Sequence, residues 1–333
     1  MCIRDRPNFQ TLRVSEILEV RGDLQRMQLE GGARAYALVA VVGIVEVGDL
    51  VVVNTTAIDL DLGTGGWHVV HSVVDRTEWT TAGSGHVLKA RYLSEQLAVD
   101  PHVSTRTDLV GARVLLCVLH SHVGAVSVGL NSANLGYLMT DQASLPLGLS
   151  DLVATLKAKN LVRHTVTAGQ AFGGDLEAVS VASAAAALLD NGCTQIVLAS
   201  GPGHVGTSSP LGFSAMELAG HASVLSALGA QVGLCVRASD RDDRLRHQGI
   251  SHHSQTLLSA IPVPIDVPLP PDVDSSWIAN TGHRAFPVEP VDISTAVANA
   301  DISITMMGRP ITEDPVACSH IGAAAAWLGN LAS

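Results

Sequence analysis

Histidine, aspartate and glycine residues gather in the segments that directly follow apolar runs of the chain. His120 ends one such run, Asp141 follows the next, and His252 and His253 stand side by side further on. Imidazole and carboxylate groups serve as general acids and bases and as ligands of divalent metals. We therefore take five residues as candidate catalytic residues: His120, Asp141, Asp175, His252 and His253.

The pair His252 and His253 is expected in the first turn of a helix that Ser251 caps. A helix N-terminus disfavours an imidazolium, so at least one of the pair should be neutral and able to act as metal ligand, base or hydrogen-bond donor. Adjacent helical side chains point about 100° apart, so a single metal would take one of them. A mixed nitrogen and oxygen site for a divalent metal is one interpretation, and polar cap, loop and core roles are the other. The further members of such a site would be His120, Asp141, Asp175 and His204.

A glycine-rich segment, Gly201 to Gly206, matches Gly-x-Gly-x-x-Gly after a predicted strand. Its backbone amides could approach a phosphate or carboxylate, or the glycines could simply form a tight turn. A dinucleotide fingerprint opens the first strand-to-helix turn and precedes an acidic residue by about 20 positions, whereas this segment follows the fourth strand. We therefore disfavour a dinucleotide and leave the cofactor unknown. The candidate ligand-binding residues are Gly169, Gln170, Gly173, Gly174, Gly201, Gly203, His204, Gly206, Thr207 and Ser251.

Residues 106–333 alternate apolar strand patterns with amphipathic helix patterns, which predicts an α/β domain. The strands are near-continuous apolar runs, as in parallel strands buried on both faces. Helices are expected to start at Ser150, at Gly174 or Asp175, at Pro210 and at Ser251, and an Ala-rich helix runs from about 315 to 331. This order indicates an open, mostly parallel, doubly wound (Rossmann-like) sheet, with a ligand site beyond the carboxyl ends of the strands. The expected strands are 113–119, 135–139, 165–168, 195–199, 231–237 and 263–267.

Residues 7–105 predict a smaller N-terminal antiparallel β domain, either a barrel or a sandwich. Met27 and Leu29 alternate with polar Gln28 and Glu30, and glycine turns separate short runs without a helical period. We expect a small-molecule site at the strand ends of the α/β domain and on the face between the domains. Residues 1–6 match the translated end of a transposon-based sequencing adapter and are set aside as an artefact. The expected strands are 13–20, 35–47, 49–54, 67–74 and 86–92.

Composition excludes several classes of protein. Of 333 residues, 47% are apolar, so general disorder is excluded, and the chain is expected to be soluble because no apolar run reaches the roughly 18 residues of a membrane helix. A net charge of −11 and 3% aromatic residues argue against nucleic acid as a partner. Cys117 and Cys235 lie in strand patterns without a close-spaced partner, which favours the cytoplasm. The oligomeric state is left open.

Several long motifs occur in a fixed order, and together they resemble the uncharacterised bacterial family DUF3866 from about residue 12 to residue 322. The resemblance implies that the Gly201 to Gly206 segment belongs to a family-specific pattern and not to a known dehydrogenase. It assigns no activity. Among the motifs are Leu119-His120-Ser121, Met139-Thr140-Asp141, Gly169-Gln170-Ala171-Phe172-Gly173-Gly174-Asp175, Gly201-Pro202-Gly203-His204-Val205-Gly206-Thr207 and Gly249-Ile250-Ser251-His252-His253.

Two functions are compatible with these residues. The first is an enzyme acting on a small molecule, in particular a metal-assisted hydrolase. In it, His252 or His253 with His120 and Asp141 would be ligands or acid/base groups, and the amides of residues 201–207 would bind an anionic part of the substrate. The alternative is a non-catalytic regulatory protein that binds a nucleotide or metabolite.

Overall fold

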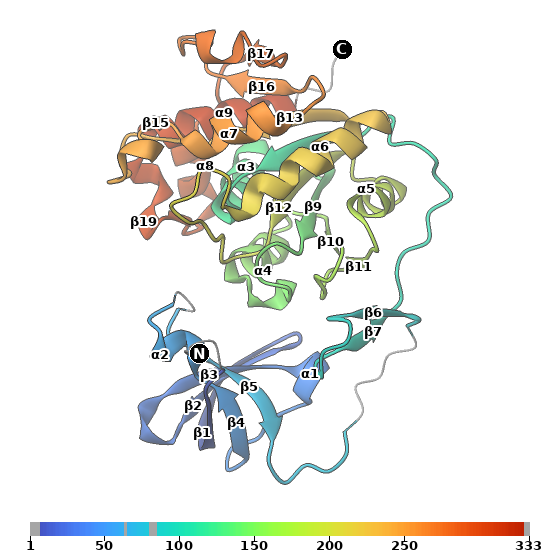
Figure 1. Ribbon diagram of the computed structural model, residues 1–333, viewed down its shortest axis with the longest axis vertical. Coiled ribbons are helices and arrows are strands. Elements are labelled where there is room, and N and C mark those ends of the chain that lie inside the picture. The colour runs from blue at the N-terminus through green and yellow to red at the C-terminus, as the bar shows by residue number, and fades with distance from the viewer. Residues whose placement is uncertain (1–6, 63–64, 80–84, 330–333) are drawn as a thin grey trace. The chain divides into compact units, whose positions relative to one another are not determined.

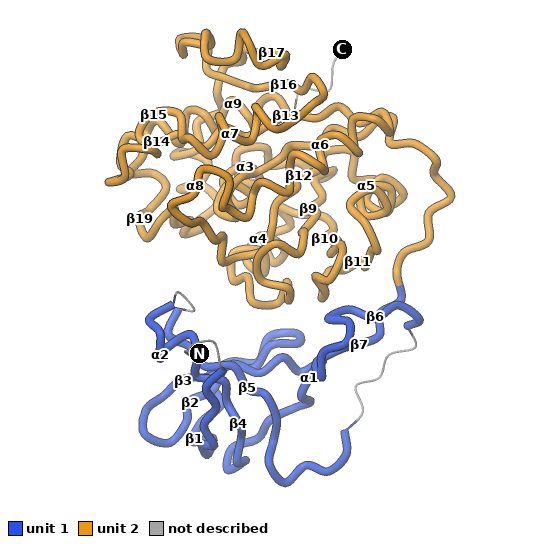
Figure 2. The backbone as a smooth tube through the Cα atoms, viewed as in Figure 1, with its two compact units in different colours: residues 1–100 blue, residues 101–333 orange. Residues whose placement is uncertain are grey.

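The computed structural model describes residues 7–62, 65–79 and 85–329. These residues fold as two compact units, residues 1–100 and residues 101–333 (Figure 2). The proposed adapter residues 1–6 and the expected last turn of the Ala-rich helix, beyond residue 329, lie outside the described residues. Within the described ranges, no helix has both the length and the apolar character needed to cross a bilayer.

Unit 1 is built on a closed five-stranded barrel with the strand order β1-β2-β3-β5-β4. The long strand β1 pairs with β4 through its first residues and with β2 through the rest, and this closes the barrel. All pairings are antiparallel except β3 with β5. The barrel strands are β1 (Phe9–Arg21), β2 (Leu24–Leu29), β3 (Arg34–Leu38), β4 (Leu50–Asn54) and β5 (His68–Val73), and a hairpin of β6 (Val87–Lys89) and β7 (Leu97–Val99) follows them.

The period-2 pattern of the barrel strands places alternate side chains inside. Met27 and Leu29 are fully buried while Gln28 between them is not, as the alternation predicts. The expected strand 35–47 is wrong in its second half, because the chain leaves the sheet at Leu38 and forms the short helix α1 (Val39–Val42). A second short helix, α2 (Thr56–Asp59), follows β4. Apolar runs of this length do not separate strand from helix by periodicity alone.

Unit 2 is an open sheet of eight parallel strands in the order β11-β10-β9-β12-β8-β13-β16-β17. The fold is therefore the predicted doubly wound α/β type. Two strands were not predicted: β11, which has two residues, and β17. The strands are β8 (Arg113–Cys117), β9 (Leu135–Thr140), β10 (His164–Thr167), β11 (Leu176–Glu177), β12 (Gln195–Ser200), β13 (Gln231–Cys235), β16 (Asp266–Leu269) and β17 (Arg284–Pro287).

Helices cover both faces of this sheet. Alternate residues of one strand enter different cores: Leu116 packs with the first group of helices, and Leu115 and Cys117 pack with the second. In the view of Figure 1, α6 lies in front of the strands. The first group is α5 (Val181–Asp190), α6 (Leu218–Ala227) and α7 (His252–Ala260), and the second is α3 (His120–Leu130), α4 (Asp151–Ala158), α8 (Ile293–Ala300) and α9 (Pro315–Gly329).

Trp327 packs helix α9 against the middle of the sheet. The indole is fully buried, and its Nε1 donates to Asp266 Oδ2 of β16 at 3.1 Å. Arg113 of β8 lies over the ring, 5.0 Å from its centroid. A Cβ added at Gly233 of β13 would lie 2.8 Å from the ring, so only glycine leaves room for it. One aromatic side chain thus contacts three strands.

Two predicted helix starts are wrong. The helix expected from Gly174 or Asp175 begins at Val181, because the Asp175 carboxylate accepts from Thr165 N and Thr165 Oγ1 of β10 and does not cap a helix. Ser180 provides the cap by accepting from Ser183 N. The helix expected from Pro210 begins at Leu218 and follows a 3₁₀ turn.

Two small hairpins also belong to the described part of unit 2. A hairpin of β14 (Ala238–Ser239) and β15 (Gly249–Ile250) precedes α7. A second hairpin of β18 (Thr305–Met306) and β19 (Arg309–Pro310) precedes α9. The first hairpin carries the loop between Asp240 and Gln248, which lies next to the first turn of α7.

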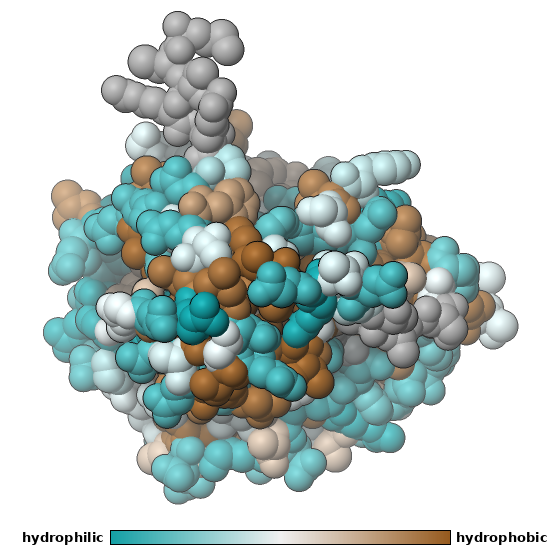
Figure 3. Space-filling view, turned by 90° about the horizontal axis from the view of Figure 1, so that it is seen from below, coloured by the Kyte–Doolittle hydropathy of each residue, from teal (hydrophilic) through white to brown (hydrophobic). Residues whose placement is uncertain are grey.

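Apolar side chains also occur on the surface. Figure 3 shows brown apolar residues near the middle of one face of the molecule, surrounded by teal polar ones. Exposed apolar residues occur in both units, among them Val20 at 67% and Leu245 at 82% exposure. A chain with only 15% charged residues has few charged groups with which to cover its surface.

Candidate functional site

The carboxyl ends of β8 and β12 form a switch point of the sheet. These strands are neighbours, yet β8 leads into α3 on one face and β12 leads towards α6 on the other. Loops that diverge in this way leave a crevice between them, where doubly wound proteins bind ligands. His120 begins α3 after β8, and His204 lies in the loop that follows β12.

His120 is fixed in one orientation by both ring nitrogens. Its Nδ1 lies 3.2 Å from the carbonyl oxygen of Ser200, and its Nε2 lies 2.8 Å from Ser150 Oγ. A carbonyl only accepts, so Nδ1 carries the proton and Nε2 accepts from the Ser150 hydroxyl. Burial lowers the pKa of His120 to about 4, although the bond to Ser200 opposes this, so the ring is neutral at pH 7. Ser150 is 4% exposed and acts here as a positioning residue that also caps α4.

A cavity of about 540 Å³ lies beside His120. His204 lines the same cavity, as do Pro202 and Gly203 from the loop after β12. The remaining lining residues come from the starts of α3 and α4 and from residues 301–307. The structure thus brings His120 and His204, which are 84 positions apart in the sequence, to the wall of one cavity.

Four imidazoles form what we call the histidine cluster: His204, His247, His252 and His253. The ring centroids of His252 and His253 are 4.3 Å apart, and His247 lies 5.0 Å and 4.8 Å from them. His204 lies 5.8 Å from His253, so the cluster reaches the cavity. Phe213 stacks on His253 at 4.0 Å and covers the cluster.

The nitrogen atoms of this cluster are close together and in part unpaired. One ligand atom from each of His247, His252 and His253 lies within 4.8 Å of the others, so the expectation that a single metal would take one of the pair is wrong: both members offer a nitrogen at this distance. In the described part of the chain, neither ring nitrogen of His204 has a hydrogen-bond partner, nor has Nε2 of His252, and all three atoms are buried. Buried polar atoms are nearly always paired, so three unpaired ones in one place indicate that a ligand or ion belongs there.

The cluster is held in the neutral state. Burial, and next the nearby Arg237 cation, lower the pKa of His253 to about 3 and those of His204 and His247 to about 4. The pKa of His252 is lowered too, by burial and by Arg246. Neutral imidazole is the form that binds metal or accepts a proton.

Arg237 is the buried charge behind the cluster. It is 3% exposed, lies 3.3 Å from His253 Nδ1, and pairs with Asp242 at 3.1 Å. Burial lowers its pKa to about 10, so it stays charged at pH 7. Asp242 also binds Arg244 at 2.8 Å, which leaves one carboxylate between two guanidinium groups and the surroundings net positive.

The two predicted aspartates do not join the histidines. Asp141 follows β9 as expected, but its carboxylate accepts from Gln170 N at 2.8 Å and lines a separate cavity of about 300 Å³ with Gly169 and His221. Asp175 lies level with the start of β10, where it pairs with Lys157 and Thr165. The side chains that gather at the histidines therefore offer nitrogen atoms and no carboxylate from Asp141 or Asp175, so the mixed nitrogen and oxygen set, which was one of the two interpretations, is not formed.

The predicted glycine loops are mostly bonded internally. Gly173 N donates to Glu177 Oε1 at 2.7 Å, and Gly174 N donates to Thr167 Oγ1 at 3.3 Å. In the loop after β12, Thr207 N donates to the Gly212 carbonyl at 2.7 Å, and the φ of +90° at Gly203 makes the turn. Of the other candidates there, Gly201 packs against Met139 and Ser144, and Gly206 lies 3.7 Å from His253, measured from an added Cβ.

Ser251 has the predicted role and a further one. Its Oγ accepts from His253 N at 3.2 Å and so caps α7. The same oxygen lies 2.7 Å from His247 Nδ1, which brings His247 to the pair on α7. His247 was not predicted, although it stands five and six positions before the pair, across a glycine turn.

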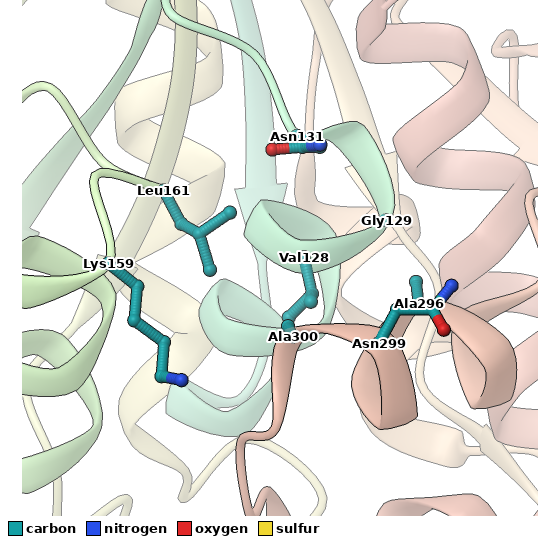
Figure 4. Close-up of a pocket in the computed structure, with 8 residues that line it drawn as sticks. All are labelled: Val128, Gly129, Asn131, Lys159, Leu161, Ala296, Asn299 and Ala300. Carbon is teal, nitrogen blue, oxygen red and sulfur yellow. The ribbon is translucent and has the colours of Figure 1, made fainter.

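A third cavity lies at the opposite end of the sheet. It has about 440 Å³ and is shown in Figure 4, where Asn131 comes from the end of α3, Lys159 from the segment after α4, and Asn299 from α8. The end of α3 precedes β9, so this cavity is at the amino ends of the strands. Its lining contains a single ionisable group, Lys159, and no acid/base pair. It is therefore a weaker candidate than the cavity at the histidine cluster.

The fold and the site define a class: a two-unit protein whose larger unit is a doubly wound α/β sheet with neutral histidines at a switch point. The chain belongs to the DUF3866 family, described as "Protein of unknown function", whose sequence model matches residues 34–325. The resemblance predicted from the motifs is thereby confirmed. No curated protein matches the chain.

Proposed function

We propose that the protein is a small-molecule enzyme, a metal-assisted hydrolase, with its site at the carboxyl ends of the strands of unit 2. The observation that carries the proposal is the convergence of His247, His252 and His253 within 4.8 Å, beside a cavity lined by His120 and His204. Three histidines and an open position are the ligand set of many catalytic zinc sites.

The donor set suits a divalent metal of the zinc type. Zn–N bonds of about 2.0–2.1 Å require donor atoms about 3.4 Å apart, so side-chain rotations that move each atom by about 1 Å would suffice. The imidazoles are neutral and need lose no proton to bind. Such a metal would polarise a carbonyl or phosphoryl oxygen and lower the pKa of bound water.

The surrounding charges favour an anionic substrate. Arg246 is exposed, and its Nε lies 3.4 Å from His247 Nε2, while buried Arg237 lies behind His253. Guanidinium groups bind carboxylate and phosphate in a fixed geometry. We therefore expect esters or amides that carry a phosphate or carboxylate group.

His204 is placed to move the proton. Its ring lies between the cavity and His253, it is neutral, and in the described chain both its nitrogens lack a partner. In hydrolysis, water adds to the carbonyl carbon or the phosphorus and the bond to the leaving group breaks. His204 would take the proton from water and return it to the leaving group.

Elemental analysis of the purified full-length chain tests the metal, and hydrolysis of p-nitrophenyl phosphate and p-nitrophenyl acetate tests the reaction. We expect bound metal, turnover that chelation abolishes, and loss of the chelatable metal and of turnover in the double variant H252A/H253A. H221A, which changes a histidine of the separate cavity, is the matched control.

A double variant with unchanged metal content and unchanged turnover would overturn the proposal. Stabilisation by a nucleotide or sugar phosphate in a thermal-shift screen, without any turnover, would favour the regulatory alternative instead. We also propose that the protein is bacterial and that it is located in the cytoplasm. The four cysteines of the described residues, which are all free and buried, support the second part.

A further inference from the structure

A second group of metal-ligating side chains lies beneath the switch point. We call Cys117, His122 and Cys235 the thiol cluster, and one ligand atom from each lies within 4.8 Å of the others. Cys117 and Cys235 are the last residues of the adjacent strands β8 and β13, where they are register partners. His122 lies in the first turn of α3, directly after β8. Parallel pairing thus brings together two thiols that are 118 positions apart in the sequence.

The thiol cluster is closed to solvent. Cys117 and His122 are each 1% exposed and Cys235 is fully buried. His122 Nδ1 has no hydrogen-bond partner among the residues that the structure describes. A buried ring nitrogen without a partner is destabilising unless something binds it.

A fourth ligand is available from α9. His320 is 4% exposed, its Nδ1 lies 2.8 Å from the Val316 carbonyl, and its Nε2 is buried without a partner in the described ranges. The carbonyl fixes the proton on Nδ1, so the free Nε2 is the atom that can bind a metal. His320 lies outside the 4.8 Å group of the other three ligands, so its side chain would have to move to complete the set.

We propose that Cys117, His122, Cys235 and His320 form a structural site for one thiophilic metal ion, with Zn²⁺ as the fitting ion. Two thiolates and two imidazoles are a common set for structural zinc. Binding forms two Zn–S and two Zn–N bonds and releases the two thiol protons to solvent. Zn²⁺ with two thiolates has no net charge, which suits a site whose two thiols belong to the apolar core on this face of the sheet.

Such an ion would tie together four elements that meet below the proposed active site. It would join the ends of β8 and β13 to α3 and α9, which pack on the same face of the sheet. The structural site does not depend on the proposed hydrolase function.

Cobalt substitution of the full-length chain distinguishes the two sites. Thiolate ligands give Co²⁺ an intense charge-transfer band in the near ultraviolet, whereas a site of histidines alone gives none. We expect this band, and about one chelator-resistant Zn²⁺ per chain, in the wild type, in H252A/H253A and in the control C193S, which changes a fully buried cysteine outside the cluster. In C235S and H122N the band and the resistant zinc should be lost.

An unchanged band or zinc content in C235S would overturn the proposal. So would a folded wild-type chain that takes up Co²⁺ without the band, a result that needs no variant to fold. A Cys117–Cys235 disulfide, seen as resistance of both thiols to alkylation until reduction, would also overturn it. In H252A/H253A, loss of the chelatable metal together with an intact thiolate band would show that the two sites bind metal independently. One site can then fail the test without the other.

Discussion

Replacing Gly169 by alanine should destabilise unit 2 by about 3–5 kcal/mol. Gly169 has φ of +67°, and a Cβ there would lie 2.2 Å from Asp141 Oδ2. The left-handed backbone costs alanine about 1–2 kcal/mol. The carboxylate must also move away, and this breaks its hydrogen bond to Gln170 N, a charge-assisted bond worth about 1.5–3 kcal/mol.

Gly249 provides the matched control. Its φ of +62° is almost the same, yet an added Cβ would meet no atom within 4 Å. Gly249→Ala should therefore cost only the backbone term, about 1–2 kcal/mol. Urea unfolding followed by far-ultraviolet circular dichroism measures both, because most of the helix in the described chain belongs to unit 2.

A double-mutant cycle isolates the clash. In an Asp141→Ala background the carboxylate is gone, so Gly169→Ala should cost no more than Gly249→Ala. Equal losses for Gly169→Ala and Gly249→Ala in the wild-type background would refute the reasoning. A cost at Gly169 that persists without Asp141 would refute it as well, because the strain would then lie in the backbone alone.

Three further outcomes follow from single contacts. Trp327→Ala should lower the free energy of unfolding of unit 2 by about 3–5 kcal/mol, because it leaves a cavity at a fully buried position and removes the indole donor of Asp266. A loss below about 1 kcal/mol in urea unfolding would contradict this packing. Burial raises the pKa of Asp175, but the hydrogen bonds from Lys157 and Thr165 outweigh burial, and the net pKa is lowered. The ionised carboxylate therefore stabilises the fold above its unfolded pKa of 3.8. This stabilisation is lost as the pH falls through the folded pKa. With the carboxyl 36% exposed, Asp175→Asn should cost about 1 kcal/mol at pH 7 and progressively less as the pH is lowered below 3.8, as urea midpoints measured over this range will show, and it should leave any hydrolysis rate unchanged. His204→Ala should reduce kcat of the proposed hydrolysis by about 10²–10⁴-fold with the metal content unchanged, and an unaltered kcat would exclude His204 as the proton-transfer group.

The class of fold was predictable because strands that are buried on both faces are near-continuous apolar runs in the sequence. Residues 114–117 and 196–199 are all apolar, and both became the middle of central strands. The two missed strands are at the edges of the sheet, where one side is open. Strand β11 pairs through only two residues, Leu176 and Glu177, and so short a segment has no periodicity to detect.

The candidate site was predictable where local rules suffice. Ser251 caps α7 and places His252 and His253 in its first turn, as the sequence indicated. Convergence over long distances was not predictable, because it depends on the strand order. That β12 and β13 both flank β8 decides which loops meet, and no residue pattern encodes this order.

Asp175 shows how a local rule can fail. An acidic residue after two glycines is a reasonable helix start. Its carboxylate oxygens, however, can accept hydrogen bonds from a neighbouring strand as well as from the next turn of their own chain. Here Lys157 and Thr165 provide the partners. The helix consequently begins six residues later, at Val181.

The position of β8 has a consequence for synthesis of the chain. It is the first strand of unit 2, yet its two neighbours, β12 and β13, begin only at Gln195 and Gln231. On the ribosome, one edge of this apolar strand stays without its final partner until β12 has emerged, and the other until β13 has emerged. Chains that stall after β8 and before residue 195 would expose the unpaired backbone groups of both edges of this strand. Aggregation of nascent chains should therefore peak for stalls between these points and decline once β13 is complete.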